Sequence, residues 1–278
     1  MAIPQFNSRP HAALAQWQSD GYIILRNHFT QTQCEELNEF TTTLWQERHS
    51  SPSNATIDIF LDRPENKRVL LSQAPDEAFD YSFKINDLYL DEHLIRDYAL
   101  DPGLCETLNL LLDGEALAFN TLLFRWGSQQ REHTDTLYMP PRKTDKLVVS
   151  WIALDEANAD NGAVTLYPGS HLIPPHRFSD GRLNAIGTEM GAYYDHMAQE
   201  LKSRGIEPLH FNAEPGDVLI WHAQLLHGGS PIKDWQNTRR SLVTHYYRKQ
   251  EYLHQFWRLR KHGGGYYLKR PHPSPDKN

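Results

Sequence analysis

From residue 116 to residue 247 the chain alternates short runs of β-branched, aromatic and leucine residues with turn-forming residues. The runs that we predict as strands cover residues 117–126, 146–154, 163–167, 218–221, 224–227 and 239–247. Many short strands at this spacing, separated by Gly, Pro, Asn and Asp, indicate a β-sandwich or barrel. The sequence therefore predicts a mainly β fold with flanking α-helices.

The segments around this β-rich core have different patterns. We predict a helix at 11–20, a short strand at 22–26, a long helix at 31–47 and two helices within 94–112. In the long helix, Cys34, Leu37, Phe40 and Leu44 recur at helical spacing. Two stretches are polar and are expected to be loop-rich or irregular, namely 49–85 and 170–209. The glycines at 263–265 suggest a flexible hinge, and residues 269–273 a loosely packed terminus.

The length of 278 residues, without a linker or an internal repeat, is consistent with one domain over 1–278. We divide it into a helical part at about 1–115, a barrel core at about 116–247 and a C-terminal extension at 248–278.

Composition and charge limit the class of partner. The formal net charge of −7 argues against nucleic acid, which calls for a basic face, but leaves room for an anionic small molecule. No apolar run approaches the roughly 20 residues of a membrane span, and the N-terminus lacks the pattern of a secretory signal. Cys34 and Cys105, far apart in sequence, are expected to be free thiols in a reducing compartment. We expect a cytoplasmic protein without a membrane partner, and no pattern indicates its oligomeric state.

The segment His133-Thr134-Asp135 is a candidate metal-ligand pair. On a strand, residues i and i+2 point to the same face, so the imidazole and the carboxylate would project together. Two His and one carboxylate on one face of an octahedron are the ligands of non-haem Fe(II) oxygenases. The third ligand could be His222 or His227. We favour His227, because two glycines that permit a close backbone approach follow it and because odd separation puts His222 on the opposite face of a regular strand.

Two adjacent arginines begin the last predicted strand. A guanidinium binds a carboxylate through two parallel hydrogen bonds, so an arginine near the metal would suit a dicarboxylate ligand. Since neighbouring residues of a strand face opposite sides, only one of Arg239 and Arg240 can point inward.

At this point the chain resembles a known family. The motifs are His133 to Tyr138, 151–156, Asp160-Asn161-Gly162-Ala163, 166–171, Glu214-Pro215-Gly216-Asp217, His222, His227 and the residues from Arg239 on. In their order and spacing they are similar to the phytanoyl-CoA dioxygenase family of iron(II)/2-oxoglutarate oxygenases. The segment Asp20-Gly21-Tyr22, before a short strand and a long helix, also fits.

The resemblance implies a double-stranded β-helix, the jelly-roll barrel of cupins, with Fe(II) bound by His133, Asp135 and His227. It implies that 2-oxoglutarate binds Arg239, with Arg240 as the alternative, and that Ser230 and Asn120 contribute to the co-substrate pocket. The expected reaction uses O2 to hydroxylate a small molecule and releases succinate and CO2. The alternative is a metal-binding barrel of the same lineage with a non-oxidative or ligand-binding role.

Overall fold

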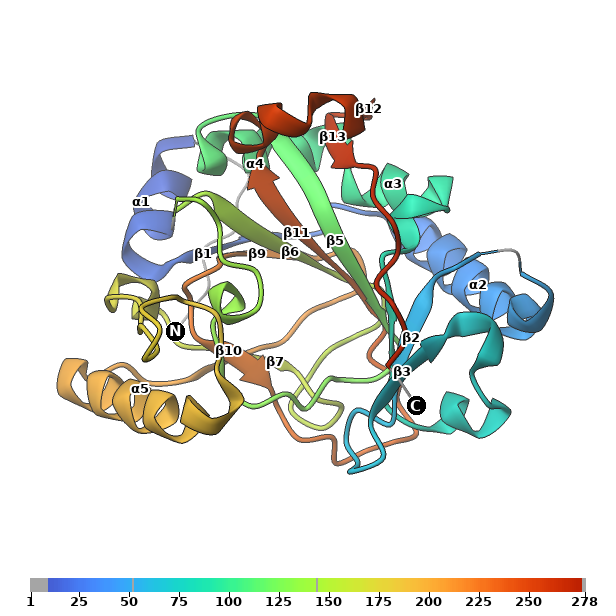
Figure 1. The fold of residues 1–278 in the computed structure, drawn as a ribbon, viewed down its shortest axis with the longest axis horizontal. Helices are drawn as coiled ribbons and strands as arrows, with labels where there is room; N and C mark the ends of the chain where they lie inside the picture. The colour runs from blue at the N-terminus through green and yellow to red at the C-terminus, as the bar shows by residue number, and fades with distance from the viewer. Residues whose placement is uncertain (1–9, 52, 144, 277–278) are drawn as a thin grey trace.

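The computed structural model describes residues 10–276 except residues 52 and 144. Two sheets oppose each other (Figure 1). The major sheet has the order β1 (Tyr22–Leu25), β9 (Val218–His222), β6 (Leu147–Ala153), β11 (Ser241–Arg248), β5 (Ala116–Phe124), β4 (Lys84–Asn86), β2 (Thr56–Ile59) and β3 (Lys67–Leu70). The minor sheet has the order β10 (His227–Gly229), β7 (Val164–Leu166) and β8 (Leu209–Phe211). The prediction of a jelly-roll fold with flanking helices is confirmed.

The two faces of the major sheet belong to different cores. Ile23, Ile152 and Ile220 pack on the outer face with the helices, whereas their neighbours Ile24, Trp151 and Leu219 face the minor sheet. This division follows from the alternation of side chains along a strand. Because both faces are buried, the central strands read as continuous apolar runs.

The helices cover the outside of this sandwich. They are α1 (Pro10–Asp20), α2 (Gln31–Glu47), α3 (His93–Ala99) and α4 (Pro102–Leu112), all of which were predicted. Helix α2 begins with a capping box, in which the Thr30 hydroxyl accepts from the Gln33 amide and the Gln33 side chain accepts from the Thr30 amide. No helix in the described part of the chain has both the length and the apolar character to cross a membrane.

Two polar stretches are more regular than expected. Residues 49–85 contain β2, β3 and the first two residues of β4, and these strands extend the major sheet beyond β5. These strands are three or four residues long and carry Asp58, Arg68 and Lys84, so their pattern does not resemble that of an apolar strand. Residues 170–209 contain α5 (Met190–Arg204), of which only Tyr193 and Met197 are buried. An apolar face that narrow gives a weak helical signal.

The C-terminal extension is ordered against the rest of the fold, contrary to the prediction of a hinge and a loose terminus. Strands β12 (Leu259–His262) and β13 (Gly265–Leu268) form a hairpin, and β13 pairs in parallel with β5. Beyond the hairpin, the chain runs past the end of β5 to the β2–β3 edge (Figure 1). There the amides of Asp276 and Arg68 form reciprocal hydrogen bonds, one to the Arg68 carbonyl and one to the Asp276 side chain.

A tight turn before β9 generates a test of the fold. Gly216 has φ of +91°, and a Cβ placed there would lie 2.0 Å from the Phe29 carbonyl oxygen. We expect Gly216→Ala to lower the free energy of unfolding by at least about 2 kcal/mol, measured by urea denaturation, because it adds backbone strain to a steric clash.

Gly187→Ala is the matched control, since a Cβ at Gly187 meets nothing within 4 Å. That substitution should change stability by less than about 0.5 kcal/mol. An equal loss of unfolding free energy in the two variants would contradict the packing of this turn against Phe29.

Candidate metal centre

Three of the predicted ligands meet at one end of the space between the sheets. His133 and His227 face each other across an isolated β-bridge, in which the two residues exchange backbone hydrogen bonds of 2.8 and 3.0 Å. Asp135 Oδ1 lies 3.9 Å from His133 Nε2 and 3.7 Å from His227 Nε2. All three side chains are buried, and their donor atoms could reach one metal ion.

Hydrogen bonds fix the orientation of both imidazoles. The Nδ1 atom of His133 lies 2.8 Å from the Arg131 carbonyl, and that of His227 lies 3.0 Å from the Leu225 carbonyl. A carbonyl only accepts, so each Nδ1 carries a proton, and in the neutral tautomer the lone pair that a metal requires is then on Nε2. Burial lowers the pKa of His133 to about 3, with a further contribution from His227, so His133 is neutral at pH 7.

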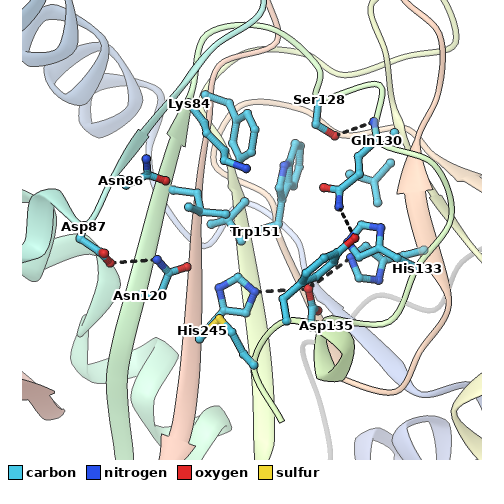
Figure 2. Close-up of a pocket in the computed structure, with 18 of the residues that line it drawn as sticks. Lys84, Asn86, Asp87, Asn120, Ser128, Gln130, His133, Asp135, Trp151 and His245 are labelled. Atoms are coloured by element: carbon cyan, nitrogen blue, oxygen red, sulfur yellow. Dashed lines mark hydrogen bonds and ion pairs between the residues drawn. The ribbon is translucent and has the colours of Figure 1, made fainter. Parts of the chain in front are cut away.

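The two oxygens of Asp135 have different partners. Trp221 Nε1 donates to Oδ2 at 2.8 Å, and His245 Nε2 lies 3.3 Å from Oδ1 (Figure 2). Burial by itself would raise the pKa of Asp135, but the electrostatic contribution of His227 and the hydrogen bond with His245 outweigh it and hold the pKa well below its usual range. The carboxylate is therefore ionised and oriented, with Oδ1 toward the histidines.

The local backbone differs from the predicted strands. His133 pairs only through the bridge, and Asp135 begins a 3-10 turn (Asp135–Leu137) after the extended residue Thr134. Residues 223–226 form a turn, in which the Leu225 amide donates to the His222 carbonyl at 2.7 Å. The face-alternation argument against His222 therefore does not apply. His222 is nevertheless engaged elsewhere, because its Nδ1 accepts from the Gln224 amide at 3.0 Å.

A cavity of about 440 Å³ opens from this centre. It extends between the sheets past Trp151 to Lys84 and Asn86 of β4 (Figure 2). Arg270 and Pro273 of the C-terminal segment also line it. The residues that line it include His133, Asp135, His227, Arg239, Trp151, Asn120, His245, Lys84, Asp87, Arg68 and Arg270.

Arg239 and Arg240 point to opposite sides. The Arg239 side chain is buried in the cavity wall, where its Nη1 donates to Ser241 Oγ at 3.1 Å and its Cζ atom lies 5.3 Å from the Trp151 ring centre. Its Nε has no hydrogen-bond partner, and no carboxylate pairs with it among the described residues. Burial lowers its pKa to about 10, so it remains a cation at pH 7. Arg240 instead donates to Asp155 Oδ2 at 2.9 Å, outside the cavity.

The other two predicted pocket residues have different positions. Asn120 lines the cavity, where its side chain donates to Asp87 Oδ1 at 2.9 Å. Ser230 does not line it, because its hydroxyl pairs with Thr165 Oγ1 at 2.9 Å and with His210 Nδ1 at 3.2 Å. Gly229, two residues after His227, lies at the cavity instead.

Several lining residues were not predicted. Lys84 and Arg68 belong to strands that were not predicted from the sequence. Arg270 belongs to the C-terminal segment that was predicted to be loosely packed. His245 stands two positions beyond Val243 on β11, and both line the cavity. The period of two from Val243 to His245 is the one signal that could have found it.

Comparisons with known proteins agree with this geometry. A model of the family "Phytanoyl-CoA dioxygenase (PhyH)" matches residues 17–241. A probable phytanoyl-CoA dioxygenase of Caenorhabditis elegans is 23% identical over 83% of this chain and 72% of its own length. The peroxisomal phytanoyl-CoA dioxygenase of Homo sapiens is also 23% identical, and the match covers 83% of this chain and 66% of the human protein.

Solved structures show the same fold. EctD from S. alaskensis, with bound Fe, has a TM-score of 0.64 at 16% identity, covering 95% of this chain and 82% of its own. The α-ketoglutarate-dependent epimerase SnoN has a TM-score of 0.61 at 17% identity, covering 86% and 82%. The match of the family model over most of the chain, together with the buried His-Asp-His set, decides the assignment. The chain belongs to the phytanoyl-CoA dioxygenase (PhyH) family of oxygenases, which use iron and 2-oxoglutarate.

Proposed function

We propose that this protein is a dioxygenase that hydroxylates a small molecule, with iron held by His133, Asp135 and His227 and 2-oxoglutarate held by Arg239. One observation supports it above all. An open-faced set of two imidazoles and a carboxylate shares a cavity with a buried guanidinium that has no carboxylate partner among the described residues.

The donor set fits Fe(II). Two imidazoles and one carboxylate on one face leave positions for a bidentate co-substrate and O2. Iron with 2-oxoglutarate supplies the activation of O2 for oxidation of a C–H bond, with succinate and CO2 as products. Since Asp135 keeps its carboxylate, no ligand position is left for a halide, and we favour hydroxylation over halogenation.

The chain's own residues orient the ligands and bind the co-substrate. Trp221 and His245 hold the carboxylate of Asp135 against rotation. The unpartnered Nε of Arg239 and the nearby Ser241 hydroxyl suit the distal carboxylate of 2-oxoglutarate, which would neutralise the buried cation. The ring of Trp151 lies 5.3 Å from the Arg239 Cζ atom and lines the same cavity, and this apolar surface would help to keep water from the pair.

The far end of the cavity favours a substrate with an anionic group. Arg68, Lys84 and Arg270 line it. Asp58 pairs with Arg68 and Lys84, and Asp87 pairs with Arg270. Of the carboxylates beside these cations, which are Asp58, Asp87 and Asp276, only Asp87 lines the cavity. The three cations are therefore placed to contact an anionic group of a substrate. A small molecule is proposed because about 440 Å³ must hold both 2-oxoglutarate and the reacting part of the substrate.

The alternative, a barrel that binds metal without oxidation, differs in one requirement. A non-oxidative protein needs no 2-oxoglutarate, so the unpaired Arg239 would have no function. A cytoplasmic location stays a prediction.

A turnover assay tests the proposed function. The purified protein, loaded with Fe(II) and supplied with O2 and 2-oxoglutarate, should form succinate. When a library of small organic anions is screened, a compound that is a substrate should raise the rate of succinate formation. Asp135→Ala should abolish succinate formation. Absence of both 2-oxoglutarate binding and succinate formation in the Fe(II)-loaded protein would reject the proposal.

The two arginines generate a paired prediction. We expect Arg239→Gln to weaken 2-oxoglutarate binding by at least about 2 kcal/mol, or roughly 30-fold in the dissociation constant, since it removes charged hydrogen bonds in a buried site. Arg240→Gln should leave that constant unchanged, because its partner Asp155 lies outside the cavity. Calorimetry under anaerobic conditions measures both. The opposite ranking would make Arg240 the anchor.

Trp221 generates a second prediction. Trp221→Phe keeps an aromatic ring but removes the hydrogen bond to Asp135, and the affinity for Fe(II) should fall roughly 10-fold or more. Trp235→Phe is the control, because Trp235 is 38% exposed and does not line the cavity. Anaerobic metal titration followed by calorimetry gives the two constants, and an unchanged affinity in Trp221→Phe would show that Asp135 needs no such support.

A further inference from the structure

A second group of metal-ligand side chains lies outside the cavity. His93 and Asp97 stand one turn apart on α3, and His262 ends β12. Asp97 Oδ2 lies 3.3 Å from His93 Nδ1, and Asp97 Oδ1 lies 2.7 Å from His262 Nε2. The two imidazole rings meet edge to face, with centroids 4.7 Å apart.

The backbone holds His262 in this place. The hairpin turn after it packs on the end of α3, where the Gly264 amide donates to the Leu100 carbonyl at 2.9 Å. Gly263 has φ of +48°, and a Cβ there would lie 2.2 Å from the Leu100 carbonyl oxygen. The turn therefore requires glycine, and it fixes the hairpin against α3 independently of the side chains.

We propose that His93, Asp97 and His262 form a zinc site. Two imidazoles, one carboxylate and a water are a common donor set for tetrahedral Zn²⁺. Ligands at ~2.0–2.1 Å from tetrahedral zinc lie about 3.3 Å apart, which the pair of His93 and Asp97 already matches. The ligand atoms of all three residues lie within 4.8 Å of one another, so side-chain rotation would bring them to one ion. The exposed side chain of His93 leaves room for the water.

This site would act on the cavity through the C-terminal extension. Strand β13 continues into Arg270, which donates to Asp87 Oδ2 at 2.7 Å, and Pro273, which lines the cavity. Zinc would join α3 to the hairpin, and the segment with Arg270 and Pro273 that lines the cavity follows this hairpin. The proposal does not depend on the chemistry of the first centre.

The test counts zinc in the full chain. After incubation with Zn²⁺ and gel filtration, the wild type should retain two zinc ions per chain, because the first centre can also bind zinc. His93→Asn should retain one. In a background with Asp135→Ala and His227→Ala, one zinc should remain, and adding His93→Asn should remove it. His93 is 73% exposed at its side chain, so this variant should fold.

His49→Asn is the matched control. His49 Nε2 lies 3.7 Å from Asp76 in another exposed His–Asp pair. Among the described residues, this pair is not part of a group of three metal-ligand side chains. It should retain as much zinc as its parent. The site is rejected if His93→Asn and His262→Asn bind as much zinc as the proteins that they derive from.

Proteolysis gives a second readout. Trypsin can cleave at three exposed basic residues, Arg258 just before the hairpin and Arg260 and Lys261 within its strand β12. Zinc should slow this cleavage several-fold in the background that lacks the first centre, and the protection should be lost with His93→Asn, by linkage of binding to local opening. Equal protection in both proteins would overturn the proposal.

Discussion

The two backbone hydrogen bonds between His133 and His227 are the constraint on which the centre depends. They join the segment after β5 to the edge of the minor sheet, so both imidazoles belong to residues of one β-bridge. The close approach requires the glycines after His227: a Cβ on Gly229 would lie 2.8 Å from the Gln129 amide nitrogen, and one on Gly228 would lie 3.0 Å from the Gln130 carbonyl oxygen. Trp221 on β9 then orients the carboxylate, so both sheets contribute to the centre.

Charge explains why the cavity divides into two ends. Near the metal ligands, Arg239 is a buried cation without a carboxylate partner among the described residues. Such a charge is costly to bury unless a ligand neutralises it. At the other end, Arg68, Lys84 and Arg270 are already paired with Asp58 and Asp87. We therefore propose the first end as the site of the co-substrate and the second as the part of the cavity that contacts the substrate.

The sequence predicted those parts of the molecule in which a local pattern carries the information. The spacing of Cys34, Leu37 and Leu44 gave α2, and the apolar runs gave the central strands. The motifs predicted His133, Asp135 and His227 as metal ligands, and these residues do lie together, although the strand geometry assumed around Asp135 was wrong. Lys84 and Arg270 were missed, because polar edge strands and a polar tail have no apolar period, and their places depend on contacts with Asp58 and Asp87. Ser230 was predicted in the co-substrate pocket from its spacing after His227, but its side chain forms a hydrogen bond with Thr165 instead.

An anaerobic crystal structure of the protein with Fe(II) and 2-oxoglutarate would test the central claim most directly. Anomalous scattering at the iron edge locates the metal independently of the coordinates. Our interpretation predicts one strong iron peak within bonding distance of His133 Nε2, Asp135 Oδ1 and His227 Nε2, with a carboxylate of 2-oxoglutarate on the Arg239 guanidinium. Iron bound without one of these three side chains, or 2-oxoglutarate bound away from Arg239, would contradict it.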